Sequence, residues 1–374
     1  MTAHGSNELL SAVINRNLCI GCGACVNLCP YFKSFKGTIS QLFPCNLEEG
    51  RCYANCPKVG VDLNRLSESY FNHPYTGDPL GTYESIHIAW AGEATPRGGF
   101  QSGGTVSALM SFAIEESLVN AAVLTDRVGL EPIPRTVTSP DDVLRCAASK
   151  YTAAPTIAEV NAALKADHDA IGVVATPCQA LALAQMRTNS SNEGDTTNKI
   201  KLVIGLFCTW ALDYRSLESF FSERVKLDTI KKIDIPPPPA EVMVVENSAG
   251  TMEIPLSEIR EMIPDSCRYC IDMTGEFSDV SVGVLEGEPT KNTLIVRTSL
   301  GRELVEKATR KGYLQTEPYP EEALEHLRWA ARRKKQRAVT LLDETELISE
   351  DTYEKLSVLK MSKKVVESIV KRSS

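Results

Sequence analysis

The chain has 374 residues, of which 43% are hydrophobic and 24% are charged, and its formal net charge is -8. This length allows two or three domains, one of them large enough to bury a substantial core. Apart from the short basic run at 332–335, no basic face or arm is evident, so nucleic acid is disfavoured as a partner.

Residues 1–64 contain seven of the twelve cysteines, and the segment before them has neither the basic nor the apolar region of a secretory signal. No apolar run reaches the roughly 18 residues needed for a membrane span. We therefore expect a cytoplasmic protein without a membrane span, whose cysteines bind metal rather than form disulfides.

The first cysteine run has the spacing of a bacterial ferredoxin. Its members are separated by two, two and three residues and followed by a proline; they are Cys19, Cys22, Cys25 and Cys29. In such runs the fourth cysteine usually serves the other cluster of a pair. We therefore predict that the first three hold one 4Fe–4S cluster together with Cys56.

The second half of the ferredoxin pattern is irregular, because Asn46 and Glu49 stand where two cysteines of a full repeat belong. With Cys45 as a substitute, Cys29, Cys45 and Cys52 offer three thiolates to a second site. We expect a cluster with a non-cysteine ligand, a three-iron cluster, or one completed from elsewhere. A disulfide framework and structural zinc are the alternatives for the whole module.

A turn-rich segment at 65–80 follows, which we interpret as a linker with little to bury. Beyond it, apolar runs and their periodicity predict strands at 86–91, 121–124, 171–175 and 201–207 and helices at 106–118 and 140–149. The sequence therefore predicts an α/β core with a mixed sheet and flanking helices, preceded by a small ferredoxin-like iron–sulfur domain and followed by a helical tail.

Residues 97–105, between the first strand and the first helix of this core, are rich in glycine. Glycines let the backbone approach a ligand closely, and free amides at a helix start attract phosphate. Ser102, Gly103, Gly104 and Thr105 are therefore candidates for binding phosphate or pyrophosphate. The alternative is a flexible turn in which Ser102 or Thr105 caps the helix.

Cys178 and Cys208 each follow a predicted core strand directly. Open α/β sheets bind their ligands at such carboxyl ends. Cys267 and Cys270 form a Cys-x-x-Cys pair, which alone could bind zinc, act as a redox pair or be inert. Together the four cysteines complete a cubane site. Cys146 is left over and is expected to be a small buried residue of a helix.

Five motifs of the core follow one another in a recognisable order. They are Gly103-Gly104 before a helix, Ser149-Lys150-Tyr151-Thr152, Thr176-Pro177-Cys178-Gln179, Phe207-Cys208, and Cys267-x-x-Cys270 with the segment 276–283. In this order they resemble the beta subunits of coenzyme F420-reducing hydrogenases and dehydrogenases. Segment 293–304 looks like the C-terminal domain of that family, and the likeness covers roughly residues 80–315.

The resemblance implies an iron–sulfur flavoprotein oxidoreductase that transfers electrons between a hydride carrier, coenzyme F420, and one-electron iron–sulfur carriers through FAD. It implies a cluster at Cys178, Cys208, Cys267 and Cys270 beside the flavin, which with the front module makes two to three clusters, mainly 4Fe–4S. The implied FAD contacts are Ser102, Gly103, Gly104, Thr105, Lys150, Tyr151, Thr152 and Gln179. The implied partners are a subunit of a larger redox complex or a ferredoxin.

A flavin suits this set of sites because it links a two-electron carrier to one-electron clusters. Lys150 is the predicted catalytic residue, since a cation near the flavin N1–C2 edge stabilises the reduced anionic ring. The alternative is a solvated lysine at a helix end. A second function is a non-catalytic iron–sulfur adaptor, and NAD(P)H or ferredoxin could replace F420 in the first.

The C-terminal segment is strongly helical and charged from Glu321 to Arg337 and from Glu350 to Arg372. It carries an apolar strip that packs on its own domain or docks on a partner subunit, made of Leu324, Leu327, Ala330 and Ala331. We divide the chain into a ferredoxin-like domain at 1–64, a linker at 65–80, a core binding FAD and a 4Fe–4S cluster at 81–318, and a helical tail at 319–374.

Overall fold

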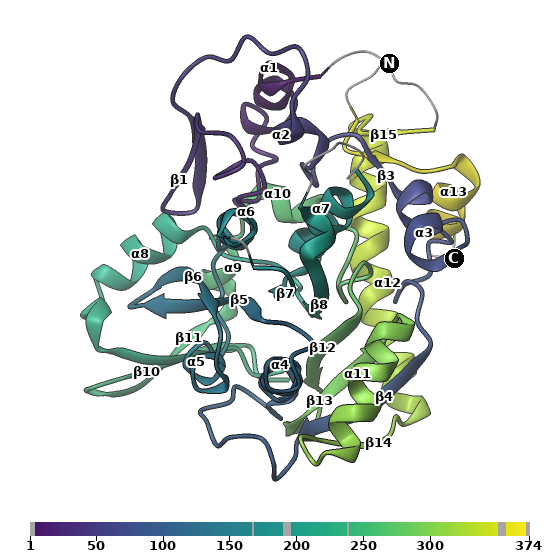
Figure 1. Cartoon of the computed structure of the whole chain (residues 1–374). Helices are drawn as coiled ribbons and strands as arrows, with labels where there is room; N and C mark the ends of the chain where they lie inside the picture. Colours follow the sequence, from purple (N-terminus) through teal and green to yellow (C-terminus); the bar gives the residue numbers. More distant parts are fainter. Residues whose placement is uncertain (1–3, 167, 190–195, 238, 351–356, 372–374) are drawn as a thin grey trace.

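The computed structural model describes residues 4–166, 168–189, 196–237, 239–350 and 357–371. At its centre is an eight-stranded mixed sheet in the order β14-β4-β13-β12-β8-β7-β5-β6 (Figure 1). Its strands are β4 Ser85–Ala91, β5 Ala121–Val128, β6 Glu131–Val137, β7 Ile171–Ala175, β8 Ile200–Leu206, β12 Val280–Leu285, β13 Glu288–Val296 and β14 Leu314–Pro318. The central strands β12, β8, β7 and β5 are parallel, and the outer strands are antiparallel to their neighbours.

Helices cover both faces of this sheet because its inner strands are apolar on both sides. On β5, Ala122 and Leu124 pack into one apolar layer and Val123 into the other. The first layer is covered by α4 (Thr105–Glu115) and α11 (Ser299–Arg310), and the second by α6 (Thr156–Lys165) and α7 (Pro177–Thr188). The short helix α5 (Pro140–Arg145) packs beside α4. The predicted fold class is confirmed.

A smaller antiparallel sheet in the order β11-β10-β9 stands apart from the large one. Its strands are β9 Ile230–Asp234, β10 Val242–Asn247 and β11 Gly250–Pro255. The helices α8 Tyr214–Ser222 and α9 Leu256–Arg260 and the 3-10 turn Leu227–Thr229 are nearby in the chain, whereas the 3-10 turn Thr197–Lys199 leads into β8 of the large sheet. Phe221 and Ile259 are fully buried in its core. The chain returns from this unit through α10 (Asp265–Arg268), which carries Cys267.

The front module is built from short elements. They are α1 Ser6–Leu9, a π-helical turn Leu10–Ile14, β1 Phe32–Phe35, β2 Thr38–Gln41, α2 Arg51–Ala54 and β3 Val61–Asp62. β3 pairs in parallel with β16 (Leu359–Lys360), which pairs in parallel with β15 (Ile348–Ser349). Strands from opposite ends of the chain therefore share one small sheet.

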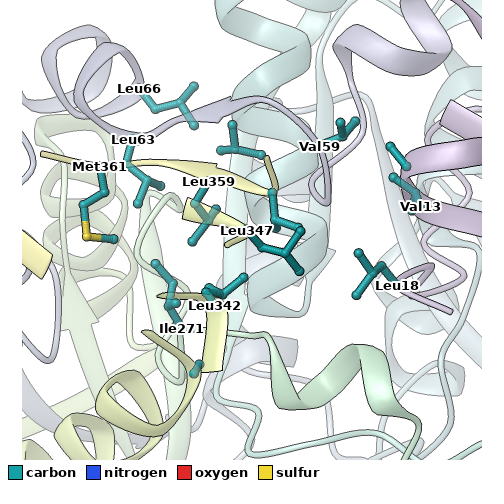
Figure 2. Close-up of a cluster of buried hydrophobic side chains, with 14 of the residues drawn as sticks. Val13, Leu18, Val59, Leu63, Leu66, Ile271, Leu342, Leu347, Leu359 and Met361 are labelled. Carbon is teal, nitrogen blue, oxygen red and sulfur yellow. The ribbon is translucent and has the colours of Figure 1, made fainter. Parts of the chain in front are cut away.

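The front module and the tail also share one apolar core (Figure 2). Its members come from the front module, from α3 (Leu63–Phe71), from the tail and from the α/β core; they include Val13, Leu18, Val59, Leu63, Leu66, Ile271, Leu342, Leu347, Leu359 and Met361. The long helix α12 (Glu321–Glu344) and α13 (Lys363–Lys371) supply the tail's side of the contact. Within the predicted strip of α12, Ala331 is buried and the other three residues are half-buried.

Two segments differ from the sequence expectation. Residues 65–80 begin within α3, and Leu66, Tyr75 and Leu80 are buried, because the tail and the core supply surface that the local sequence does not reveal. The second expected helix of the tail appears as α13 preceded by β16, while residues 351–356 and 372–374 lie outside the described residues. Among the described residues, no helix is long and apolar enough to cross a membrane.

Candidate functional site

The predicted sites lie along one edge of the large sheet. β4, β12, β8 and β7 run in the same direction, so their carboxyl ends share that edge. The glycine loop follows β4, while Cys208 and Cys178 follow β8 and β7. β4 is three strands from β8 in the sheet order, which corresponds to about 14 Å at the usual spacing of strands.

Four cysteines from distant parts of the chain meet at this edge, and we name Cys178, Cys208, Cys267 and Cys270 the core thiol set. Burial, together with the neighbouring Cys270 and Cys267, raises the pKa of the Cys178 thiol to about 12. Burial also raises the pKa of Cys208, and the other three thiols add to that rise. The side chains are therefore within electrostatic reach of one another. Four such thiols are the donor set of a cubane cluster, so the residues fit that group; their role as ligands stays a prediction.

Backbone contacts fix the segments that carry these thiols. The Cys208 amide donates to the Met273 carbonyl at 2.9 Å. The Ala211 amide donates to the Cys267 sulfur at 3.5 Å, and the Cys270 thiol donates to the Asp272 carbonyl at 3.3 Å. On the other side, a capping box of Thr176 with its partner three residues on starts α7 and holds Cys178 in the first turn.

Two buried lysines reach the core thiol set. Lys58 Nζ donates to the Ser266 carbonyl at 2.9 Å, and Lys334 Nζ donates to the Cys208 carbonyl at 2.6 Å. The two lysines are only 4% and 5% exposed. Burial raises the pKa of the Cys267 thiol, and both ammonium groups oppose the rise. Lys58 and Lys334, which are not themselves thiol ligands, therefore place positive charge next to the core thiol set.

A second group of four thiols, Cys19, Cys22, Cys25 and Cys56, lines a cavity in the front module, and we name it the proximal front set. Burial raises the pKa of Cys22 well above its usual range, and the other three thiols add to the rise. Gly23 has a φ of +84°, and a Cβ there would lie 2.8 Å from the backbone nitrogen of Ala158 on α6. The module thus packs closely on the core, and its donor set fits a cubane.

The remaining front cysteines, Cys29, Cys45 and Cys52, form the distal front set. Burial raises the pKa of Cys52, and both other thiols contribute to the rise. Nearby in the chain, Phe43 and Leu47 are 62% and 66% exposed, so this set lies closer to the surface. All twelve cysteines are free thiols, which leaves the disulfide framework unformed. Among the described residues, no three metal-binding side chains are close enough to hold a single ion.

The glycine loop is anchored to the hairpin between β12 and β13. Ser102 Oγ donates to the carbonyls of Pro289 and Lys291 at 2.8 and 2.9 Å. Gly103 packs so closely against β13 that a Cβ would be 2.7 Å from Asn292 Oδ1. Gly104, with a φ of +79°, is the N-cap of α4. The loop is therefore a packed structure and differs from the flexible turn that the sequence also allowed.

Two polar atoms at the glycine loop are buried without a partner. They are Thr105 Oγ1 and Gln101 Nε2. Buried polar atoms are normally hydrogen-bonded, and a bound group is one way to supply the missing partners. This observation fits a phosphate-bearing ligand at the start of α4.

A series of contacts, which we name the wall, connects the glycine loop to the core thiol set. Gln101 Oε1 accepts from the Ser149 amide at 3.3 Å. The next residues run beside the segment after Cys208, where the Tyr151 carbonyl accepts from the Leu212 amide at 2.7 Å and Thr152 forms a bridge with Leu212. Ala211 in that segment donates to Cys267.

Lys150 and Gln179 are bonded within the chain. Lys150 Nζ donates to the carbonyls of Cys146, Ala147 and Ala148, at 2.5 to 2.9 Å, and burial lowers its pKa to about 8. Gln179 donates to the Ala154 carbonyl at 2.9 Å while its Oε1 caps α7. A structural role for both is thus visible, whereas their contact with a cofactor stays a prediction. Cys146 is half-buried at the end of α5.

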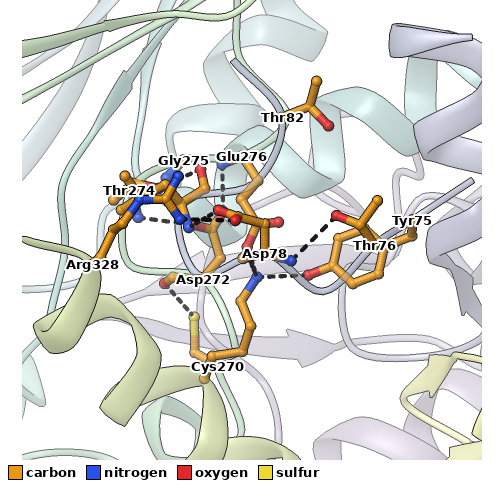
Figure 3. Close-up of polar contacts among 12 residues, drawn as sticks. Tyr75, Thr76, Asp78, Thr82, Cys270, Asp272, Thr274, Gly275, Glu276 and Arg328 are labelled. Atoms are coloured by element: carbon orange, nitrogen blue, oxygen red, sulfur yellow. Dashed lines mark hydrogen bonds and ion pairs between the residues drawn. The ribbon is translucent and has the colours of Figure 1, made fainter. Parts of the chain in front are cut away.

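A buried polar network lies behind Cys270 and ties it to α12 (Figure 3). The Asp272 carboxylate accepts from the amides of Thr274, Gly275 and Glu276. Glu276 pairs with Lys335 at 2.7 Å, with side chains 3% and 1% exposed. Burial raises the pKa of Glu276 to about 7, and Lys335 opposes the rise.

Sequence reasoning missed three residues of this region: Lys58, Lys334 and Gln101. Lys58 directly follows the Cys56-Pro57 motif, which was the one available signal. Lys334 belongs to the basic run at 332–335 and carried no sign of burial. Gln101 lies one residue before the predicted phosphate contacts and was passed over because its partner, Ser149, is remote in sequence.

Comparison with known proteins identifies the class first. Residues 12–31 match the 4Fe-4S binding domain, so the chain is an iron–sulfur protein. Residues 86–161 and 168–322 match the N-terminal and C-terminal models of the coenzyme F420 hydrogenase/dehydrogenase beta subunit. The chain belongs to the coenzyme F420 hydrogenase/dehydrogenase beta-subunit family, which confirms the resemblance seen in its motifs.

Two relatives match this chain over most of their own length. The coenzyme F420 hydrogenase subunit beta of Methanothermobacter thermautotrophicus is 28% identical over 247 residues, 65% of this chain and 87% of that protein. A subunit of the F420H2 dehydrogenase of Methanosarcina mazei is 24% identical over 317 residues, 83% and 88% of the two chains. A chain in a structure of the F420-reducing NiFe hydrogenase complex from Methanosarcina barkeri has a TM-score of 0.65 at 24% identity, covering 71% of this chain and 93% of its own, which shows the shared fold.

Proposed function

We propose that this chain is an iron–sulfur flavoprotein that transfers electrons between coenzyme F420 and one-electron carriers, as a subunit of a larger redox complex. The observation that carries the proposal is the wall of contacts from the glycine loop through Ser149 and Tyr151 to Cys267. A ligand lying along this wall would have phosphate-binding atoms at one end and the core thiol set at the other.

Different residues would bind different parts of FAD. Thr105 Oγ1, Gln101 Nε2 and the start of α4 would bind the phosphates of FAD, since these polar atoms are buried without a partner. Ser102 and Gly103 would hold the loop on the β12–β13 hairpin. Lys150, Tyr151 and Thr152 would lie along the ring system, where a cation stabilises an anionic reduced flavin. Bound FAD supplies the exchange between two-electron and one-electron chemistry.

The thiol sets would provide the exit for single electrons. Oxidation of one reduced F420 releases two electrons and two protons, so one-electron carriers must accept twice per turnover. The core thiol set stands next to the wall, and the proximal front set lies beyond Lys58, whose charge acts on both sets. The distal front set, closer to the surface, would face a redox partner subunit or ferredoxin.

The decisive experiment uses the full-length protein purified without oxygen. We expect extractable FAD, and we expect reduced F420 to bleach the flavin faster than NADH does in parallel stopped-flow runs. A protein with cluster absorption but no flavin would support the iron–sulfur adaptor and overturn the proposal. Faster bleaching by NADH would retain the flavoenzyme and change its hydride carrier.

A further inference from the structure

The two segments that flank the α/β core each send one buried lysine to the core thiol set. Lys58 comes from the front module and Lys334 from α12 of the tail. Each ammonium donates to a backbone carbonyl near a thiol. Lys58 donates to the carbonyl of Ser266, which directly precedes Cys267, and Lys334 donates to the carbonyl of Cys208. Both contacts are short, at 2.9 and 2.6 Å, and they span more than a hundred residues of sequence, 208 and 126 respectively.

A buried ammonium is stable only when an anion compensates its charge. Within the described part of the chain, neither lysine forms an ion pair with a carboxylate. Asp272 faces Lys334 electrostatically, but its oxygens already accept from three backbone amides. The groups that the two lysines face are the thiols, so the missing anion is a thiolate-bound cluster, whose net negative charge grows by one on reduction.

The two lysines differ in what they reach. Lys58 donates to the carbonyl directly before Cys267 of the core thiol set, and it also lines the cavity that holds the proximal front set. Lys334 donates to the carbonyl of Cys208, which belongs to the core thiol set. A fixed positive charge stabilises the more negative, reduced state of a cluster, so it raises the reduction potential of every cluster it faces.

We propose that Lys58 is a positioning residue shared by two clusters, which raises the reduction potentials of the proximal front cluster and of the core cluster together, and that Lys334 raises the potential of the core cluster alone. The inference rests on the proposed function, because it assumes that both thiol sets bind clusters. It assigns to Lys58 the junction at which an electron passes between the front module and the core.

The test compares Lys58→Met, Lys334→Met and Arg333→Met in the full-length, anaerobically loaded protein. Arg333 is the matched control, since it adjoins Lys334 on α12 but is exposed. Cluster potentials are read by redox titration followed by electron paramagnetic resonance, and the signal that Cys267→Ser removes identifies the core cluster. We expect Lys58→Met to lower the reduction potentials of both clusters and Lys334→Met to lower that of the core cluster alone. Each shift should be about 59 mV, which is about a tenfold change in the one-electron equilibrium constant. Arg333→Met should leave both potentials unchanged.

Three results would overturn the inference. Lys58→Met could shift the reduction potential of only one cluster or of neither, Lys334→Met could also shift the potential of the proximal front cluster, or Arg333→Met could shift the potentials as much as the buried variants do. Lys58→Arg keeps the charge and should restore both potentials, so it remains informative if Lys58→Met folds poorly. Iron content is measured first. A core thiol set without iron would refute the proposed function itself, whereas loaded clusters with unmoved potentials would refute only the roles of the lysines.

Discussion

Replacing Gly103 by alanine tests whether the glycine loop binds FAD. The added Cβ would lie 2.7 Å from Asn292 Oδ1 and 3.0 Å from both the Lys291 Cα and the Thr290 carbonyl oxygen, and two of these three atoms are backbone. The loop or the β12–β13 hairpin must therefore move. Overpacking of this kind costs about 1–3 kcal/mol. We expect the loop of the variant to relax in the free protein and to return to the wild-type conformation when FAD binds. The strain energy then weakens FAD binding by about 5-fold to 150-fold.

The assay is a fluorescence titration of flavin-depleted protein with FAD, accompanied by thermal unfolding. Gly99→Ala is the matched control in the same loop, because a Cβ at Gly99 would meet no atom within 4 Å. We expect Gly99→Ala to bind FAD as the wild type does. The reasoning is refuted if folded Gly103→Ala binds FAD within about twofold of the wild type, or if both alanine variants weaken binding equally.

Four further predictions address the clusters, the shared core and the buried network. Cys270→Ser should remove about four irons while sparing the front module; unchanged iron content measured by colorimetry would contradict the grouping. Leu342→Ala, at a fully buried position shared by tail and front module, should cost about 2–5 kcal/mol in denaturant unfolding and release front-module iron early; a loss below 1 kcal/mol, roughly the cost of a surface change, would argue against the shared core. Burial raises the folded pKa of Glu276 to about 7, so the stability contributed by the protonated carboxyl is present at low pH and is lost as the pH rises through 7. The wild type should therefore lose on the order of 1 kcal/mol relative to Glu276→Gln between about pH 6 and 8; a flat difference would refute this. Lys150→Met should slow flavin reduction by on the order of tenfold or more; an unchanged rate with a lowered melting temperature would assign Lys150 to the turn that it caps.

Four strands of the large sheet, β4, β5, β7 and β8, could be predicted because each is a short apolar run in the sequence. Segments such as 171–175 and 201–207 are short apolar runs, and a cysteine directly after each strand must lie at the carboxyl edge wherever the strand is placed. The expected strands at 86–91 and 121–124 correspond to β4 and β5 for the same reason. The spacing of the first cysteines likewise predicts a local cluster loop without knowledge of the fold.

The residues that surround the thiols could not be predicted in this way. The basic run at 332–335 looks like a solvated helix face, yet Lys334 and Lys335 are both buried. Their compensating groups, Cys208 and Glu276, are more than fifty positions away, so no local pattern records the pairing. The burial of segment 65–80 has no local signal for the same reason, since Tyr75 and Leu80 are covered by parts of the chain that are distant in sequence.

The pairing of β3 with β16 has a consequence for how the protein matures. Val61 aligns with Leu359, so the sheet of the front module includes a strand that is synthesised long after the module itself. Domains usually fold as they emerge from the ribosome, N-terminal parts first, but here β3 of the front module pairs with β16, which is synthesised much later. Iron insertion at Cys19 to Cys56 is therefore expected only after β16 has been synthesised, and deletion of β16 should lower the iron content of the front module.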